Sequence, residues 1–173
     1  MSNPEANGEL QANTLCKSCG LCCTGHLFIW TKLKSTELEP AEKLGLRVFG
    51  SMPSERGFSQ PCPLWQGKCT VYDTPHYPHY CRTYKCKLLK KLLDETTPLP
   101  EALLNIEEAK RVIHELEALL PDSASTNFRE RLVTHLEHLE QKSAWEDRDL
   151  QFRLKADALL ALFEQVFGVN DLV

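Results

Sequence analysis

The sequence predicts a small, mostly irregular cysteine-rich domain with a short strand and helix, followed by an all-α helical tail. All eight cysteines lie between Cys16 and Cys86, and the 87 residues after Cys86 contain none. Residues 1–86 carry nine Lys or Arg against seven Asp or Glu, whereas residues 87–173 carry eleven against seventeen. The two halves therefore follow different compositional rules. We expect a disordered N-terminus over residues 1–13, a cysteine-cluster domain over 14–93 and a helical hairpin or three-helix extension over 98–168.

The cysteine-rich half predicts only short regular elements. Residues 26–33, HLFIWTKL, have the aromatic and β-branched content of a strand. Residues 35–45 favour a short helix, with Thr36 and Glu39 spaced as a capping box. Residues 47–84 hold five prolines among cysteines and aromatics, a composition that does not sustain long helices. Irregular backbone with little aliphatic content needs cross-links, and the cysteines are the candidates.

The second half predicts helices with one apolar face. Residues 86–95 form a short, basic, leucine-rich helix, and residues 101–120 carry apolar side chains every three or four positions. Asn127 has the character of an N-cap for the next helix. A capping box beginning at Ser143 opens the last helix, which Gly168 ends. We expect these apolar faces to pack within the chain or against another molecule.

The candidate metal ligands are the eight cysteines. The stretch CKSCG has the Cys-x2-Cys-Gly spacing of a metal knuckle, in which two intervening residues let both sulfurs reach one ion. Gly20 permits the tight turn because it has no Cβ to clash. Four cysteines within eight positions, with four more returning about 40 to 65 residues later, strengthen this interpretation. The full set is Cys16, Cys19, Cys22, Cys23, Cys62, Cys69, Cys81 and Cys86.

Disulfides and thiol redox catalysis are the competing explanations. The even count permits disulfides, but the polar, acidic N-terminus has no apolar core of a secretory signal, so we expect a cytoplasmic protein with reduced thiols. A thioredoxin-like Cys-x-x-Cys centre follows a strand, and the polar residues before Cys16 predict none. Metal ligation therefore leads, and the predicted cysteine-rich domain is metal-stabilised.

The metal itself stays open between zinc and iron. Eight thiolates satisfy two closed tetrahedral zinc sites. Cys16, Cys19 and Cys22 also match the first three ligands of a bacterial ferredoxin run, and Cys62 precedes Pro63 as a remote fourth iron–sulfur ligand often does. Side chains of the neighbours Cys22 and Cys23 diverge, so we expect them to serve separate sites or to bridge two metals.

The segment CKSCGLCC, followed by CPLWQGKCTVYDTPHYPHYCRTYKC, resembles the CxxCxxCC cysteine-cluster family, which is described as a zinc- or iron-chelating domain. The match falls on all eight cysteines and on Pro63, Leu64, Tyr72, Arg82 and Tyr84, with Pro75 or Pro78 at the position of the family's proline. This chain departs from the family's usual Arg-Pro after the tyrosine, and its spacing before Cys81 is longer. The resemblance covers about 70 residues and implies metal chelation with no assigned activity.

Other partner classes find little support in the composition. The net charge is −4, and no apolar run approaches the roughly 18 residues that span a bilayer. We therefore expect neither a membrane nor a nucleic-acid partner. The basic run from Arg82 to Lys91 offsets thiolate charge in our interpretation. No catalytic residue stands out, so whether the chain is an enzyme stays open. The alternatives are an iron–sulfur electron carrier or oxidoreductase, and a zinc-stabilised adaptor that binds a protein partner or itself through the helical tail.

Overall fold

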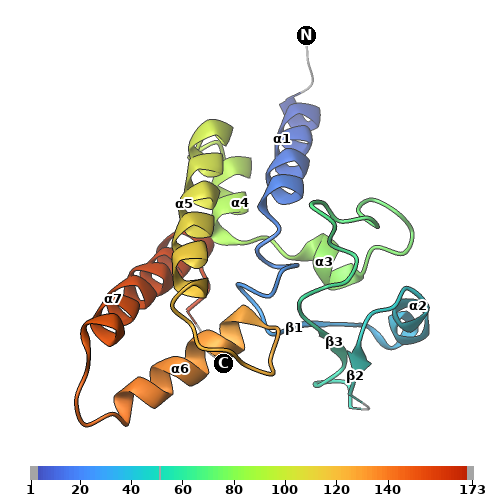
Figure 1. The fold of residues 1–173 in the computed structure, drawn as a ribbon. Helices are drawn as coiled ribbons and strands as arrows, with labels where there is room; N and C mark the ends of the chain where they lie inside the picture. The colour runs from blue at the N-terminus through green and yellow to red at the C-terminus, as the bar shows by residue number, and fades with distance from the viewer. Residues whose placement is uncertain (1–3, 51, 171–173) are drawn as a thin grey trace.

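The computed structural model describes residues 4–50 and 52–170. Over these residues the chain forms seven α-helices and one small three-stranded sheet (Figure 1). Helices α1, α4 and α5 lie side by side, with α6 and α7 beyond them. The sheet and the short helices α2 and α3 lie on the other side of α1.

The predicted all-α second half is confirmed in the described residues. Its elements are α5 (Leu99–Glu117), α6 (Phe128–Glu140), α7 (Asp147–Leu162) and the π-helical turn η2 (Phe163–Phe167). Asn127 caps α6, because its side chain accepts a hydrogen bond from the Glu130 N–H at 3.1 Å. Gly168 ends η2 in the left-handed region, as expected.

The predicted start of the last helix at Ser143 is wrong by three residues. Helix α7 instead begins after Glu146, whose backbone N–H donates to the Asp149 carboxylate at 2.9 Å. Lys142 is ion-paired to the same carboxylate at 2.5 Å. Ser143 and Glu146 have the spacing of a capping box, but the acidic side chain that closes the turn is Asp149, three residues beyond Glu146.

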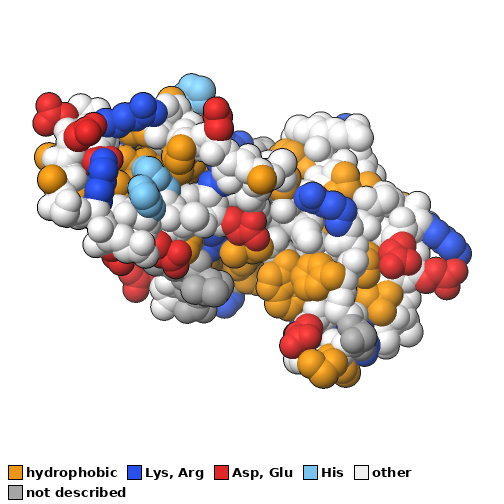
Figure 2. All heavy atoms as spheres, turned by 60° about the horizontal axis from the view of Figure 1, so that its bottom comes forward, with side chains coloured by type: hydrophobic (Ala, Val, Ile, Leu, Met, Phe, Trp, Pro, Cys, Tyr) orange, Lys and Arg blue, Asp and Glu red, His pale blue; other side chains and the backbone are white. Residues whose placement is uncertain are grey.

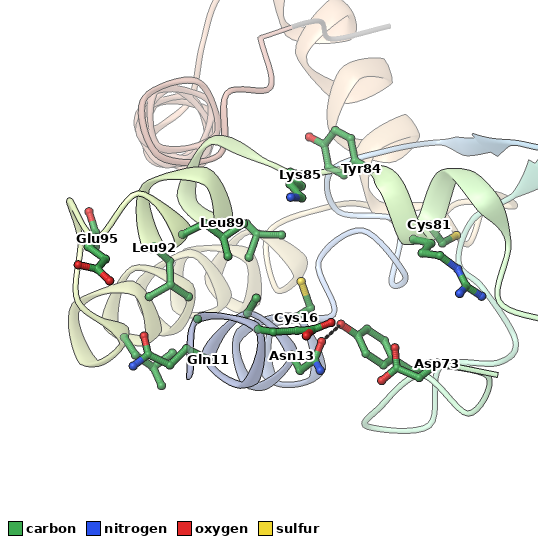
Figure 3. A pocket seen from close by; sticks show the side chains of 18 of the residues that line it. Gln11, Asn13, Cys16, Asp73, Cys81, Tyr84, Lys85, Leu89, Leu92 and Glu95 are labelled. Carbon is green, nitrogen blue, oxygen red and sulfur yellow. Dashed lines mark hydrogen bonds between the residues drawn. The ribbon is translucent and has the colours of Figure 1, made fainter. Parts of the chain in front are cut away.

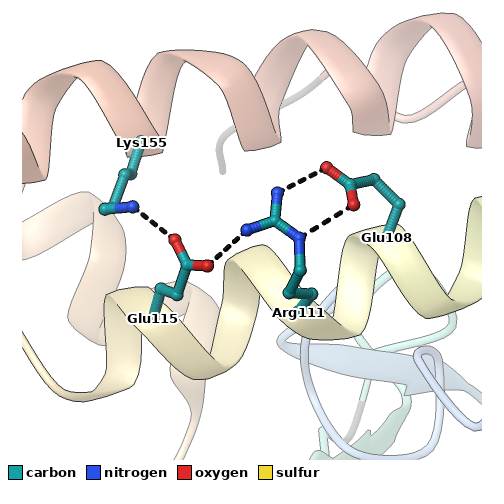
Figure 4. Close-up of polar contacts among 4 residues, drawn as sticks. All are labelled: Glu108, Arg111, Glu115 and Lys155. Atoms are coloured by element: carbon teal, nitrogen blue, oxygen red, sulfur yellow. Dashed lines mark hydrogen bonds and ion pairs between the residues drawn. The ribbon is translucent and has the colours of Figure 1, made fainter.

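Polar contacts join α5 to α7 on their exposed sides. Arg111 donates to both carboxylate oxygens of Glu108 at 2.7 and 2.9 Å and also pairs with Glu115 on the same helix (Figure 4). Lys155 of α7 reaches across to Glu115. Such surface pairs contribute little free energy individually, so the packing of the helices rests mainly on their apolar faces.

Helix α1 (Pro4–Cys19) differs from the expected disordered N-terminus over residues 1–13. The helix packs against α4 (Lys87–Leu93) and α5. Leu15 is buried in the contact, and Ala12 packs against the same core. A weakly amphipathic segment gains its helical stability from such tertiary packing, which periodicity in the segment alone does not reveal.

The larger hydrophobic core contains side chains from both sides of the predicted boundary near residues 93–98. Leu15, Leu21 and Leu27 from the first half share it with Leu88 of α4 and with the helices α5, α6, α7 and η2. All three leucines are at most 2% exposed. The helical tail is therefore packed directly onto the segment that carries the first cysteines.

The sheet and a second, smaller core form the rest of the cysteine-rich half. The strands β1 (Trp30–Lys32), β2 (Val48–Phe49) and β3 (Gly57–Ser59) pair antiparallel in the order β1-β3-β2, with Thr31 opposite Phe58. A 3₁₀ turn η1 (Ser35–Glu37), α2 (Leu38–Lys43) and α3 (His79–Thr83) complete it. The buried residues of this smaller core are Leu33, Ala41, Leu46 and Phe58.

Two of these short elements depart from the sequence prediction in detail. The strand β1 covers three of the eight residues in 26–33. The capping box expected at Thr36 and Glu39 lies two residues earlier, where the Glu37 carboxylate accepts from the Lys34 N–H at 2.8 Å. The other oxygen of Glu37 accepts from the His79 N–H at 2.7 Å and so ties η1 to α3. Glu37 serves the longer-range contact as well, which local spacing does not encode.

The surface mixes charges of both signs. Lys and Arg side chains are interspersed with Asp and Glu on the face shown in Figure 2, with hydrophobic side chains between them. Among the described residues, no helix combines the length and apolar content that crossing a bilayer requires.

Candidate metal centre

One cavity collects all eight cysteines. Its volume is about 360 Å³, and every cysteine from Cys16 to Cys86 contributes to its wall. All eight are free thiols, each partly buried. We call this space the cysteine cavity. Its other walls include apolar side chains such as Leu21, Phe58 and Phe167, together with several tyrosines.

Two helix ends position the thiols that face the larger core. Cys16 and Cys19 lie one turn apart in the last turns of α1, which places them on one side of that helix. Cys86 is the N-cap of α4, and its sulfur accepts a hydrogen bond from the Leu89 N–H at 3.4 Å. Because α1 packs against α4, the two helix ends meet at the cavity.

Gly20 turns the chain immediately after Cys19. Its φ of 71° lies in the left-handed region, as the knuckle interpretation requires. A Cβ at this position would lie 2.2 Å from the Trp65 ring. The indole therefore packs directly onto the glycine backbone and joins the first cysteine segment to the segment that contains Cys62 and Cys69.

The remaining five cysteines, Cys22 among them, come from turns and a short helix. The Cys62 N–H donates to the Cys23 carbonyl at 2.7 Å, which places residues 39 positions apart next to each other. Trp65 forms an isolated bridge with Cys69, and its N–H donates to the Cys62 carbonyl at 3.1 Å. Cys81 lies on α3, where the Tyr77 hydroxyl donates to its carbonyl at 3.0 Å. These contacts hold an otherwise irregular backbone around the cavity.

Burial and mutual proximity raise the pKa of the Cys16, Cys19 and Cys22 thiols, which therefore stay protonated near neutral pH. Burial raises the pKa of Cys16 to about 12, and the neighbouring Cys86 and Cys19 thiols add to the rise. Burial raises the pKa of Cys19 to about 11, although the Leu21 N–H opposes it. The pKa of Cys22 is raised well above its usual value by burial and then by Cys19. A cation in the cavity would reverse these shifts, since it stabilises thiolates.

The same causes act on the other side of the cavity. Burial raises the pKa of Cys23, and the thiols of Cys62, Cys81 and Cys69 raise it further. Burial and the same neighbours raise the pKa of Cys81 to about 12. The pKa of Cys62 is raised by burial, while N–H groups that point at its sulfur lower it. Backbone donors of this kind stabilise thiolates once a charge is present.

Two lysines place positive charge near these thiols. Burial raises the pKa of Cys86, while backbone N–H groups and, to a smaller extent, Lys90 of α4 oppose the rise. Lys110 of α5 lowers the pKa of Cys19 and donates to the Ser18 carbonyl at 2.7 Å. Sequence reasoning missed Lys110 because it lies 91 residues beyond Cys19. The helical tail thus contributes directly to the electrostatics of the first cysteine segment.

A larger, polar groove of about 890 Å³ adjoins the cavity. It runs between α1, α4 and the turns near Tyr72, and its walls include both Cys16 and Cys81 (Figure 3). The Tyr72 hydroxyl donates to the Asn13 side chain at 2.6 Å across it. The two cysteines lie apart along this groove, on α1 and α3 respectively.

The donor types fit a metal site, whereas the side chains do not stand in ligand positions. Within residues 4–50 and 52–170, no three His, Cys, Asp or Glu side chains form a group that could hold an ion as they are placed. Neither His76 nor His79 contributes to the cavity wall. Metal binding would therefore require the thiols to draw together within the cavity.

Three comparisons with known proteins give no match to the chain. No protein-family model, no curated protein and no solved structure matches it. The resemblance to the CxxCxxCC cysteine-cluster family accordingly rests on the pattern of its cysteines and the residues around them.

Proposed function

We propose that this protein binds metal ions, zinc or iron, through the thiolates of the cysteine cavity. The observation that carries the proposal is that cysteines far apart in the sequence come together in one cavity. Eight cysteines spread from residue 16 to residue 86 line one cavity of about 360 Å³, and none of them is in a disulfide. Reduced thiols gathered in this number are the ligands that zinc and iron–sulfur centres prefer.

The small core beside the sheet supports a structural need for metal. Only four buried hydrophobic side chains form it, and Cys62 and Cys81 pack against them. So few buried side chains stabilise a domain weakly. A structural zinc site contributes about 10 kcal/mol or more to folding, which would offset this deficit.

The identity of the metal determines the role. Zinc held by four thiolates is closed and structural, whereas an iron–sulfur cluster supplies one-electron transfer. The first alternative role is therefore an iron–sulfur electron carrier or oxidoreductase. A zinc-stabilised interaction protein is the second, and exposed leucines on the helical tail favour it. Leu104 of α5 and Leu154 of α7 are 69% and 74% exposed.

Metal analysis of anaerobically purified protein, combined with its visible absorption spectrum, tests the proposal. A brown protein containing iron and sulfide carries an iron–sulfur centre, and a colourless protein containing zinc carries zinc. The control is a variant in which the four cysteines of the CxxCxxCC segment are serines. Zinc and iron contents no higher in the natural chain than in this variant would contradict metal binding by the cavity.

The adaptor role has its own test. If the leucines of the helical tail form a contact surface, Leu104→Glu and Leu154→Glu should reduce any concentration-dependent increase in molar mass measured by light scattering. Leu104→Ala serves as the matched apolar truncation. A zinc-containing chain that is monomeric at all concentrations would argue against self-association.

A further inference from the structure

We propose that the cysteine cavity holds two separate four-thiolate sites. The first cysteine set is Cys16, Cys19, Cys22 and Cys86; the second cysteine set is Cys23, Cys62, Cys69 and Cys81. This inference rests on the proposed metal binding and assigns its ligands site by site. The division passes between the neighbours Cys22 and Cys23.

Packing separates the two sets first. All four members of the first cysteine set pack against the larger core, which is shared with the helices of the second half. In contrast, Cys62 and Cys81 pack against the smaller core beside the sheet. Cys23 and Cys69 pack against neither core, and no cysteine packs against both. The cavity therefore has one wall that belongs to the helices and one that belongs to the sheet.

Backbone connections support the same grouping. The first set is carried by the end of α1, the turn after it and the start of α4, and α1 packs against α4. In the second set, Cys23 and Cys62 are joined by a backbone hydrogen bond of 2.7 Å. Cys69 folds back onto Trp65, whose N–H is bonded to the Cys62 carbonyl. Each set is thus held together by contacts of its own.

The competing assignment comes from the ferredoxin spacing, in which Cys62 joins Cys16, Cys19 and Cys22. The structure favours Cys86 as the fourth member, because Cys86 packs with these three and Cys62 packs on the other core. The fate of Cys62 and Cys86 therefore decides between the two assignments.

The experiment reconstitutes the full chain with zinc alone and maps thiol protection by alkylation and peptide mass spectrometry. We expect about two zinc ions per natural chain and about one in Cys86→Ser and in Cys62→Ser. In Cys86→Ser, Cys16, Cys19 and Cys22 should become reactive while the second set stays protected. In Cys62→Ser, the protection should be lost from the second set instead.

Variants that retain a zinc ligand cover the case in which serine prevents folding. Cys86→His and Cys62→His each replace one thiolate by an imidazole, and cobalt in place of zinc reports the change in its visible spectrum. In the double variant Cys86→His/Cys62→His, each of the two cobalt ions should have one thiolate ligand replaced by imidazole. In Cys22→His/Cys86→His, one cobalt ion should have two thiolates replaced and the other ion none. The spectra of these two double variants should therefore differ.

Three results would overturn the division or the function beneath it. Exposure of Cys16 and Cys19 in Cys62→Ser would support the ferredoxin assignment and reject ours. Loss of protection at all eight positions in both the serine and the histidine variants of either set would indicate one coupled centre. A natural chain that binds neither zinc nor iron would refute the proposed function itself. Metal analysis of the natural chain gives this result before any variant is made.

Discussion

The contact between Gly20 and Trp65 provides the sharpest test of how the cysteine cavity is built. Gly20→Ala places a methyl group where the Trp65 ring now lies, 2.2 Å from its nearest atom. The control is Gly67→Ala, because Gly67 has a φ of 75° and nothing within 4 Å of an added Cβ. Both variants force alanine into the left-handed region, and only the first also displaces an aromatic ring.

The two variants should differ by the cost of that displacement. Both variants should lose about 1 to 2 kcal/mol of unfolding free energy, because the left-handed conformation costs an L-residue that amount. Overpacking adds about 1 to 3 kcal/mol, because the rigid indole must move out of a packed position. We therefore expect a loss of about 1 to 2 kcal/mol for Gly67→Ala and about 2 to 5 kcal/mol for Gly20→Ala.

Denaturant titration at a fixed, saturating zinc concentration measures these losses, since metal content otherwise changes apparent stability. Combining Gly20→Ala with Trp65→Leu should recover part of the loss, because the smaller side chain makes room for the methyl group. Equal losses for the two glycine variants, or no recovery in the double variant, would contradict the stabilising role of the packing of Trp65 on Gly20.

Three further predictions concern the joint with the helices, the buried histidine and the metal. Asn127→Asp keeps the N-cap of α6 but removes the two hydrogen bonds of 3.3 Å that its amide donates to carbonyls of the cysteine-rich half, so it should lower the unfolding free energy by about 1 to 3 kcal/mol. Asn127→Ala should lower it by about 1 kcal/mol more, and an Asn127→Asp variant as stable as the natural protein would place all of the effect in the cap. Burial lowers the pKa of His26 from 6.5 to about 4, so the unfolded chain binds a proton more readily, and stability should fall by at most about 3 kcal/mol between pH 6.5 and pH 4. The pH slope should shrink in His26→Gln but not in the exposed control His76→Gln, and an unchanged slope in His26→Gln would contradict this origin. Finally, a strong chelator should make residues 14–86 sensitive to proteolysis, and continued protection after complete loss of metal would show that this half folds without it.

Local signals predicted the second half of the chain well. Asn127 caps its helix as expected because a cap needs only contacts within one turn. The start of α7 was misplaced for the same reason, since Ser143 and Glu146 have the right spacing but Asp149 forms the bond. Local chemistry therefore locates a helix end to within a few residues and leaves the choice between neighbouring caps to tertiary contacts.

The cysteine-rich half shows what local signals miss. The eight thiols were identified from their spacing, yet the grouping of Cys86 with Cys16 depends on how α4 packs against α1. The contact of Trp65 with Gly20 and the position of Lys110 also depend on pairs of residues far apart in the sequence. Spacing identifies the candidate donors of a site, and only the fold shows which of them lie close together.

The placement of Cys86 at the start of α4 also has a consequence for biosynthesis. Cys22 and Cys86 are 64 positions apart, so translation at about 5 to 20 residues per second separates their synthesis by about 3 to 13 s. Throughout this interval α1 lacks the two helices against which it packs, and its thiols remain outside a folded core. The thiols of the nascent chain are therefore exposed at this stage to oxidants and metal ions from which the finished fold partly buries them.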